Sequence, residues 1–194
     1  MKISTLINNG GIGVVPTDTL YGLVGSAFSE AAVEKIYRVK KRNLKKPFII
    51  IIGAMADLEL FGIKLSEGED AILKNIWPGK VSVILPCHLK KFTYLHRGTK
   101  SLAFRLPKKQ KLINLIKETG PLAAPSANPE KFPPAESIKE AKKYFGDKVD
   151  FYINRGKIKS QPSTLVEIKN GELIIKRQGA VKIKSALAHK KITL

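Results

Sequence analysis

The stretch "VVPTDTLYGL", residues 14–23, decides how the fold is read. Its first residues end an expected strand over 12–16, and three polar residues then follow together at 17–19. A plain turn needs only one or two such residues. This turn is therefore expected to present its hydroxyl groups and the Tyr21 phenol to something outside the chain. Gly22 is expected to let the chain turn away without a side chain in the way.

The chain around this stretch alternates between expected strands and expected helices. The β-branched run "FIIII" at 48–52, bounded by Pro47 and Gly53, is typical of a fully buried strand. Ser29 is expected to cap a helix that follows it. The pattern predicts an α/β fold, with one domain over residues 1–194 and a twisted mixed sheet. Further strands are expected at 81–85, 101–106 and 122–124, and helices at 2–8, 66–77, 109–119 and 137–145.

The last regular part of the chain differs from the rest. The sequence "TLVEIKNGELIIKR", residues 164–177, reads as two strands around Asn170-Gly171, which is a strong hairpin signal. The sheet is therefore expected to be mixed, with crossover helices first and an antiparallel hairpin last. The least regular regions, 87–100, 128–136 and 155–162, are expected to be loops, and loops over a rigid sheet often carry function.

The charge balance is the unusual feature of the composition. The chain has 35 basic and 16 acidic residues, a formal net charge of +19. Solvated lysines in a lysine-rich proteome would explain most single lysines, but not the scarcity of acidic residues. Such a field attracts polyanions, so an anionic ligand, an anionic macromolecule or both are favoured.

Several classes of protein are disfavoured by the residue types present. Cys87 is the only cysteine, which excludes an intrachain disulfide and fits a reducing cytosol. His88, His96 and His189 lack metal-ligand spacing, so no metal site is predicted. The longest apolar run, 48–56, is far shorter than the roughly 20 residues of a membrane span. No signal peptide is apparent at the N-terminus, so we expect a cytoplasmic protein with no membrane partner.

Familiar nucleotide and hydrolase motifs are missing. No P-loop is present, no G-x-G-x-x-G follows a strand, and no Ser-His-Asp arrangement is evident. What remains is a series of polar clusters at the ends of expected strands. These are Thr17/Thr19/Tyr21, Lys40-Lys41-Arg42, Arg105, Ser126-Ala127-Asn128, Ser163-Thr164 and Arg177.

Arg105 is the most informative of these residues. An arginine on an edge strand facing solvent would be unremarkable, whereas burying a guanidinium in a central strand is expensive unless it meets an anion. Its planar fork suits a carboxylate or phosphate. The segment at 126–128 reads equally well as a helix cap or Asx turn. Arg177, taken alone, reads as a solvated strand end.

Taken in order, the clusters resemble the motifs of the YrdC/TsaC family, the L-threonylcarbamoyladenylate synthases. The family pattern is P-T-E-T-x-Y-G-L, K-x-R, W-P-G, R-[VL]-P, P-S-A-N, S-T and R-x-G. The matching residues here span nearly the whole chain: Pro16–Leu23, Lys40–Arg42, Trp77–Gly79, Arg105–Pro107, Pro125–Asn128, Ser163-Thr164 and Arg177–Gly179. The chain resembles the short form of the family, without an additional C-terminal domain.

The resemblance implies a reaction and a fold. L-threonine, bicarbonate and ATP would give threonylcarbamoyl-AMP and pyrophosphate, with Mg²⁺ carried on ATP and no tightly bound cofactor. The adenylate would pass to downstream threonylcarbamoyl-transfer proteins that modify tRNA. The implied fold is the YrdC-like fold, a twisted mixed α/β sheet with a large basic concave cavity.

The resemblance also implies roles for individual residues. Lys40, Arg42 and Arg105 would be catalytic. Threonine would be bound by Thr17, Thr19, Arg105 and Ser163. The nucleotide would be bound by Lys40, Arg42, Lys46, Ser101, Ser126, Asn128 and Arg177.

Three departures from the family pattern bear on these roles. Ile51 stands where many relatives carry a histidine that helps bind threonine. The usual S-A-N-x-S-G continues here as Pro129-Glu130-Lys131, and the usual E-S-T begins with Pro162. A non-catalytic module that binds tRNA or double-stranded RNA is the alternative, supported by the +19 charge. A related domain handling other carbamoyl adenylates is a second alternative.

Overall fold

The opening stretch forms a β-hairpin rather than a strand followed by an open turn. In the computed structural model, which describes residues 1–169 and 171–183, strand β1 (Gly13–Pro16) pairs antiparallel with strand β2 (Tyr21–Ser26). Every residue of both strands is buried. The prediction missed β2 because its glycines and its tyrosine were read as parts of a turn.

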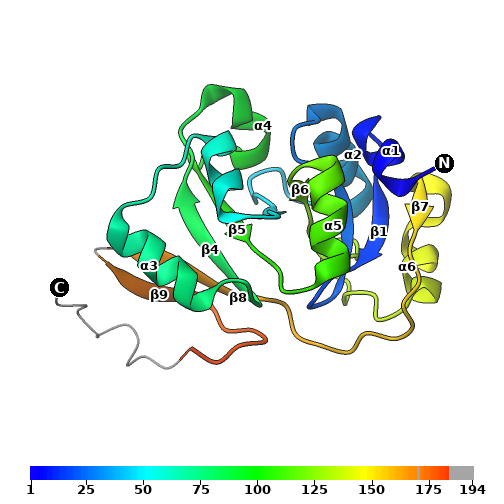
Figure 1. Ribbon diagram of the computed structural model, residues 1–194. Coiled ribbons are helices and arrows are strands. Elements are labelled where there is room, and N and C mark those ends of the chain that lie inside the picture. The colour runs from blue at the N-terminus through cyan, green and yellow to red at the C-terminus, as the bar shows by residue number, and fades with distance from the viewer. Residues whose placement is uncertain (170, 184–194) are drawn as a thin grey trace.

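Among the described residues the strands form one sheet in the order β7-β1-β2-β6-β3-β5-β4-β8-β9 (Figure 1). The pairs β1–β7, β3–β5 and β4–β8 are parallel and the others are antiparallel, which confirms the predicted mixed sheet. The remaining strands are β3 (Ile49–Ile51), β4 (Val81–Pro86), β5 (Ser101–Arg105), β6 (Leu122–Ala123), β7 (Phe151–Tyr152), β8 (Thr164–Lys169) and β9 (Glu172–Arg177).

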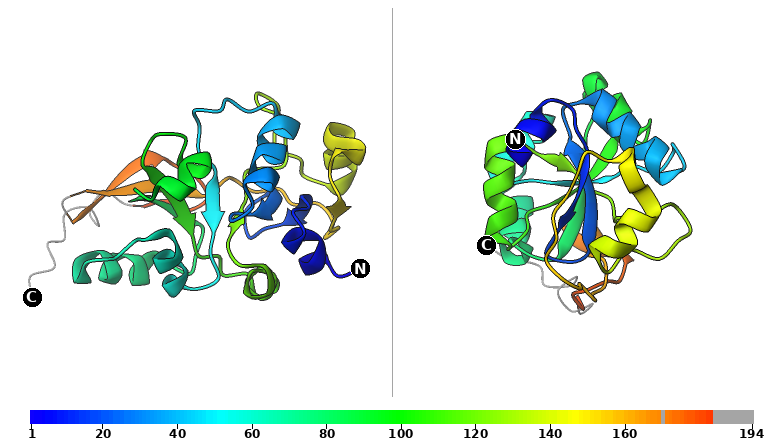
Figure 2. Two further views of the ribbon diagram at one scale, coloured as in Figure 1. Left: turned by 90° about the horizontal axis from the view of Figure 1, so that it is seen from above. Right: turned by 90° about the vertical axis from the view of Figure 1, so that its right-hand side faces the viewer.

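Helices cover both faces of the sheet (Figures 1 and 2). Helices α1, α3 and α5 lie on one face, and α2, α4 and α6 lie on the other. Serine side chains cap three of these helices: Ser29, as predicted, accepts from Ala32, and Ser66 and Ser137, which were not predicted to be caps, accept from Glu69 and Glu140. The bounds are α1 (Ile3–Asn8), α2 (Glu30–Lys40), α3 (Glu67–Ile76), α4 (Thr93–His96), α5 (Gln110–Thr119) and α6 (Ile138–Phe145).

Two apolar clusters hold the layers together. The larger one includes Ile36, Phe61 and Phe104, and the smaller one joins α1 and α5 to the sheet through Ile7, Ile51 and neighbouring residues. Burial of aliphatic and aromatic side chains on both faces supplies the main stabilisation of such a layered fold. Ile51 is fully buried in the smaller cluster, which explains why an apolar residue suits this position.

The predicted C-terminal hairpin is confirmed, and the extent of the predicted loops needs correction. Strands β8 and β9 pair antiparallel from Lys169↔Glu172 outward, while Asn170 lies outside the described residues. The region 87–100, predicted to be a loop, contains the 3₁₀ turn η2 (Lys90–Phe92) and helix α4. Another 3₁₀ segment, η1 (Met55–Phe61), and a third, η3 (Gly146–Lys148), were not predicted. Strand β7 was not predicted either.

None of the helices in the described part of the chain is long and apolar enough to cross a membrane.

Candidate functional site

Arg105 lies at the end of an interior strand and is almost completely buried. Strand β5 runs between β3 and β4, and Arg105 is 4% exposed. Its NH1 donates a hydrogen bond to Oγ1 of Thr19 at 2.9 Å, and its NH2 lies 3.1 Å from Oδ1 of Asp18. Burial lowers the pKa of Arg105, the carboxylate of Asp18 opposes this effect, and the nearby cation Arg177 adds to it. Arg105 is therefore a buried cation on an interior strand, the situation in which the sequence predicts an anionic partner.

Both members of this ion pair have polar atoms that form no hydrogen bond. Although Asp18 and Arg105 are in contact, the Nε of Arg105 and both carboxylate oxygens of Asp18 have no hydrogen-bond partner among the described residues. Buried polar atoms are nearly always hydrogen-bonded in folded proteins. This unpartnered Nε–H gives Arg105 the capacity to bind a further acceptor.

The turn between β1 and β2 uses one threonine hydroxyl for its own structure. Oγ1 of Thr17 donates to the carbonyl of Leu20 at 2.7 Å and accepts from the backbone N–H groups of Thr19 and Leu20. Nζ of Lys109 donates to the carbonyls of Pro16 and Thr17. Thr17 thus shapes the turn, and Thr19 carries the hydroxyl that faces Arg105.

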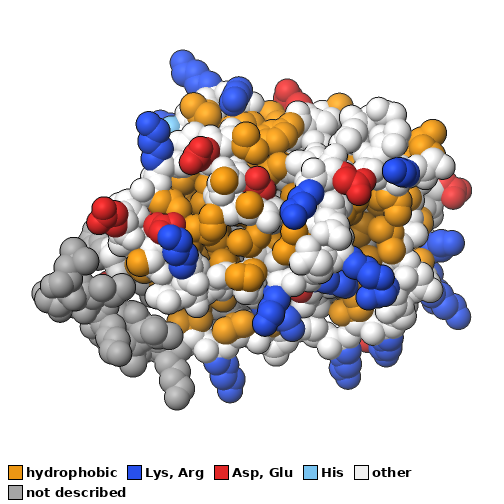
Figure 3. Space-filling model, in the orientation of Figure 1, with side chains coloured by type: hydrophobic (Ala, Val, Ile, Leu, Met, Phe, Trp, Pro, Cys, Tyr) orange, Lys and Arg blue, Asp and Glu red, His pale blue; other side chains and the backbone are white. Residues whose placement is uncertain are grey.

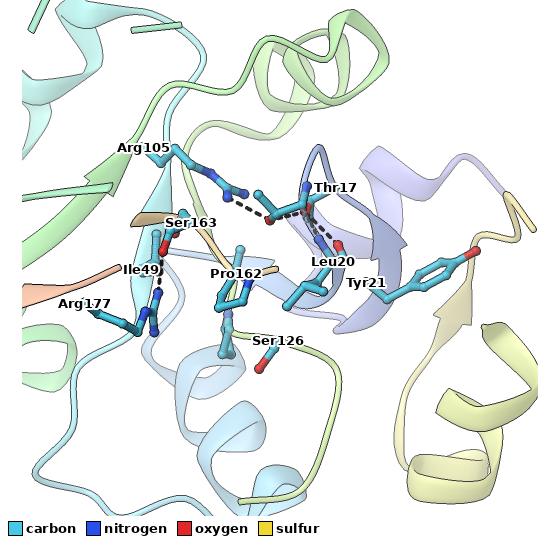
Figure 4. A pocket seen from close by; sticks show the side chains of 13 residues that line it. Thr17, Leu20, Tyr21, Ile49, Arg105, Ser126, Pro162, Ser163 and Arg177 are labelled. Carbon is cyan, nitrogen blue, oxygen red and sulfur yellow. Dashed lines mark hydrogen bonds between the residues drawn. The ribbon is translucent and has the colours of Figure 1, made fainter. Parts of the chain in front are cut away.

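Tyr21 and Gly22 have different places from those predicted. The phenol of Tyr21 points away from the pocket, and it donates to the carbonyl of Gly156 at 2.7 Å and accepts from the N–H of Arg155 (Figure 4). Gly22 lies within β2, and a Cβ there would lie 3.1 Å from Cγ2 of Thr17 and 3.5 Å from the carbonyl oxygen of Pro125. The glycine leaves room for the side chain of Thr17 and is not a turn residue.

The segment before β8 meets the end of β9 at the opposite side of the site. Ser163 is 2% exposed, and its Oγ lies 2.8 Å from Oγ of Ser82. NH2 of Arg177 donates to the carbonyl of Ser163 at 2.9 Å. The backbone N–H of Gly179 donates a hydrogen bond to Oγ1 of Thr164 at 3.0 Å. The hairpin thereby fixes Ser163 and Arg177 relative to each other.

Lys40 reaches from the end of α2 to the backbone of the loop at 125–128. The residue is 1% exposed, and its Nζ donates to the carbonyls of Ser126 and Asn128. Burial, with a smaller contribution from Arg42, lowers the pKa of Lys40 to about 7. The side chains of Ser126 and Asn128 are also bonded to each other at 2.6 Å. Lys40 therefore holds this loop in place.

Arg105, Arg177 and Arg42 form a row of basic groups in which each interacts electrostatically with the next. Arg177 interacts electrostatically with both Arg105 and Arg42, and burial followed by Arg42 lowers its pKa. Arg42 donates to the carbonyls of Lys46 and Pro47 and lies over the ring of Phe48. Cations held this close to one another repel unless an anion lies between them. The row favours a ligand that carries several negative charges.

These elements enclose a pocket of about 70 Å³, which has room for several water-sized groups (Figure 4). Arg105 and Arg177 enter it from the strands on one side, and the turn at Thr17 lies on the other. Of the predicted residues, those lining the pocket are Thr17, Thr19, Arg105, Ser126, Ser163 and Arg177.

The other predicted residues lie outside the lining of the pocket. Ser101 lies at the opposite end of β5 from Arg105, with its Oγ facing Thr99, so the structure does not bring it to the pocket. Lys40 donates to the backbone carbonyls of Ser126 and Asn128, and the side-chain amide of Asn128 donates to the carbonyls of Pro129 and Phe132. Arg42 donates to the carbonyls of Lys46 and Pro47, and Nζ of Lys46 pairs with Glu130 at 2.7 Å.

Two contributors were missed from the sequence. Asp18 was noted only as part of a motif, although it forms the ion pair with Arg105. Ser82 lies in β4 and holds the hydroxyl of Ser163. The adjacent polar residues 17–19 could have suggested Asp18, whereas a lone serine in an apolar strand gives no comparable signal. Within the described residues, no group of three or more potential metal-ligating side chains occurs.

Comparisons with known proteins identify the family of the chain. Residues 5–179 match the Sua5/YciO/YrdC family model, which carries the description "Telomere recombination". The chain is 28% identical over 174 residues to threonylcarbamoyl-AMP synthase of Cellvibrio japonicus, covering 88% of this chain and 92% of that protein. It is 29% identical to threonylcarbamoyl-AMP synthase of Pyrococcus abyssi.

Solved structures extend the likeness to three dimensions. The crystal structure of P. abyssi Sua5 complexed with L-threonine superposes with a TM-score of 0.84 at 29% identity, covering 91% of this chain. This chain spans only 52% of that longer protein. E. coli YciO, at 22% identity, shares the fold with a TM-score of 0.82 and covers 93% of this chain and 89% of its own. The ordered motifs, the sheet and the family match together establish that the chain belongs to the Sua5/YciO/YrdC family.

Proposed function

We propose that the protein is an L-threonylcarbamoyladenylate synthase, which converts L-threonine, bicarbonate and ATP into threonylcarbamoyl-AMP and pyrophosphate. The observation that carries the proposal is the buried Arg105, whose Nε–H is unpartnered beside a pocket lined by hydroxyls and a second arginine. A guanidinium in this state suits the carboxylate of an amino acid. The names of the two relatives and the threonine complex of P. abyssi Sua5 support the same substrate.

The reaction needs positioning more than it needs a protein nucleophile. The amine of threonine attacks the carbon of bicarbonate, and loss of water gives a carbamate. A carbamate oxygen then attacks the α-phosphorus of ATP, and the bond from that phosphorus to pyrophosphate breaks. Both nucleophiles belong to the substrates. The protein must hold mutually repelling anions together and stabilise charge on the phosphoryl oxygens.

The row of basic groups suits this task. In the proposal Arg105 and Thr19 hold threonine, with Ser163 beside it, while Arg177 and Arg42 face the phosphates. Ser126 and the loop held by Lys40 take the nucleoside side. Mg²⁺ enters bound to ATP, which accords with the scarcity of carboxylates around the pocket. Transfer of the adenylate to tRNA-modifying proteins in the cytoplasm completes the proposed role.

RNA binding is the second candidate function, and the net charge of +19 favours it. On the face seen in Figure 3, basic side chains are spread over the face and its edge rather than gathered in one patch. A distributed field of this kind attracts tRNA or duplex RNA without sequence readout. It does not account for a buried arginine with an unpartnered Nε–H, which is why the enzyme is preferred.

The activity assay tests the proposal directly. Purified protein supplied with Mg²⁺-ATP is expected to release pyrophosphate only when both threonine and bicarbonate are present, because the carbamate is the attacking group. Chromatography should reveal one product containing both threonine and AMP. Pyrophosphate release that ignores threonine would contradict the proposal. No release, together with RNA binding that weakens steeply with salt, would favour the RNA-binding module.

The lowered pKa of Lys40 predicts proton uptake when ATP binds. With a pKa of about 7, Lys40 is largely neutral at pH 8 in the free protein. A nearby polyphosphate favours the ammonium form and raises the pKa. The complex therefore binds more protons than the free protein above about pH 7, and below pH 6 both forms are protonated and uptake disappears.

Calorimetry in buffers of different ionisation enthalpy measures this uptake. Wild-type protein should take up part of one proton per ATP at pH 8, and Lys40→Met should take up none. Lys41→Met is the matched control, because Lys41 is exposed and adjacent in sequence. Equal uptake by wild type and Lys40→Met would show that another group titrates.

A further inference from the structure

Glu130 places a carboxylate among the basic groups that follow α2. Its Oε2 accepts a hydrogen bond from the backbone N–H of Asn43 at 2.6 Å, and its Oε1 accepts one from Nζ of Lys46 at 2.7 Å. Its own backbone N–H donates to the carbonyl of Lys40 at 2.8 Å. A backbone N–H and an ammonium that converge on two oxygens form an arrangement suited to phosphate as well as carboxylate.

More positive charge surrounds this contact. Arg42 and Lys40 both interact electrostatically with Glu130. The hydrogen bonds from Lys46 and Asn43 lower the pKa of Glu130, so its carboxylate is ionised at neutral pH. We call the group formed by the N–H of Asn43, the ammonium of Lys46 and the guanidinium of Arg42 the cationic cradle. Glu130 is the anion that occupies it in this structure.

The backbone on both sides of the contact is in an uncommon conformation. Lys41 has φ 49° and Lys131 has φ 73°, which is the left-handed region that non-glycine residues rarely adopt. One of them precedes the cradle and the other directly follows Glu130. Such conformations persist where surrounding contacts hold them, and they concentrate at functional sites. The contact therefore holds two loops, 41–47 and 129–132, against each other.

The contact is also easy to exchange. The side chain of Lys46 is 57% exposed and that of Glu130 is 21% exposed. Ion pairs this accessible are weak and are screened by salt. A polyphosphate carries several charges and more acceptor oxygens than one carboxylate. A polyphosphate can therefore displace the carboxylate of Glu130 from the cradle. The hydrogen bonds of Glu130 with Asn43 and Lys46 are then lost.

We propose that Glu130 is an internal competitor that occupies the cationic cradle and lowers the affinity of the protein for polyphosphate groups. When a nucleotide binds, its polyphosphate end takes the place of the carboxylate. Glu130 thus sets the concentration of nucleotide at which the site fills. The extension to ATP rests on the proposed function, whereas competition for the cradle itself concerns any polyphosphate.

Calorimetric titration of inorganic tripolyphosphate, and separately of ATP, tests the proposal at low ionic strength. Glu130→Gln removes the competing charge and keeps the side-chain shape, so both ligands should bind about three- to tenfold more tightly than to wild type. The gain should shrink as salt is added. Glu167→Gln is the matched control, since Glu167 forms an ion pair with Lys176 at 2.6 Å on the β8–β9 hairpin. It should leave both affinities unchanged.

Lys46→Ala breaks the same ion pair from the other side and should have the opposite effect. It removes a cradle donor, so both ligands should bind about three- to tenfold more weakly, while Lys45→Ala, at an exposed neighbour, should have little effect. If Glu130 only fastened the loops, Glu130→Gln and Lys46→Ala would both weaken binding, and the proposal would be wrong. Unchanged affinity in a folded Glu130→Gln protein would overturn it too.

The two ligands separate this proposal from the proposed function. Tighter binding of tripolyphosphate by Glu130→Gln supports the competitor even if no variant binds ATP. In that case the synthase assignment fails and the competitor stands. If wild type binds ATP and turns it over while Glu130→Gln changes neither affinity, the synthase stands and the competitor fails. Thermal melting of each variant verifies that it is folded.

Discussion

Arg105→Ala is expected to weaken threonine binding by about 30- to 1,000-fold, which corresponds to about 2–4 kcal/mol. In the proposed function the substitution removes the charge-assisted contact between the guanidinium and the carboxylate of threonine in a sheltered pocket. Arg105→Lys should recover only part of the loss, because an ammonium keeps the charge but lacks the planar fork. Affinity for ATP should change little, since the phosphates are assigned to other cations. Calorimetric titration of each ligand measures these effects.

A second substitution separates binding from structure. Removing Arg105 leaves the carboxylate of Asp18 buried without its counter-charge, which destabilises the fold by itself. In the double variant Asp18→Asn/Arg105→Ala the orphaned charge is gone, so stability should largely return while threonine binding stays lost. If threonine affinity returned together with stability, Arg105 would be a structural residue and the assignment would fail.

Gly179→Ala is expected to lower the free energy of unfolding by about 2–3 kcal/mol. A Cβ at this position would lie 2.2 Å from the carbonyl oxygen of Pro162 and 2.7 Å from the carbonyl carbon and oxygen of Ser163. All three atoms belong to the backbone, so no side chain can rotate away to relieve the contact. Urea-induced unfolding of the variant and of wild type gives the difference.

Gly68→Ala provides the control for the loss of a glycine. Gly68 lies in α3, and a Cβ there would meet no atom within 4 Å. Alanine favours a helix over glycine, so this variant should be more stable than wild type by about 0.5–1 kcal/mol. Because Pro162 and Ser163 line the pocket, Gly179→Ala should also weaken threonine binding, whereas Gly68→Ala should not. Equal stability of the two variants would contradict the clash.

The sequence predicted the elements whose signals are local. The cap at Ser29, the apolar run of β3 and the β8–β9 hairpin all depend on residues close together in the chain. Strand β2 was missed because its short, glycine-rich sequence is stabilised by pairing with β1 and β6 rather than by its own propensity. The 3₁₀ segments have equally weak local signals.

In the site, too, the sequence predicted which residues come together but not which atoms their side chains contact. The motifs identified the backbone positions that converge on the pocket, including Thr19, Arg105 and Arg177. They did not identify what each side chain contacts. Oγ1 of Thr17 is bonded within its own turn, and Lys40 holds the carbonyls of a loop distant in sequence. Such partners depend on tertiary packing, which spacing along the chain does not encode.

The pocket is assembled from segments far apart in the chain. The turn of the β1–β2 hairpin forms one side, and the β8–β9 hairpin supplies Ser163 and Arg177 on the other. A ligand that contacts both would act as a reversible cross-link across most of the folded chain. It would resist unfolding as a bond closing a long loop does, and at a hundredfold excess over its dissociation constant it would add about 2.7 kcal/mol. Occupancy by substrate would then govern how long each molecule survives against proteolysis.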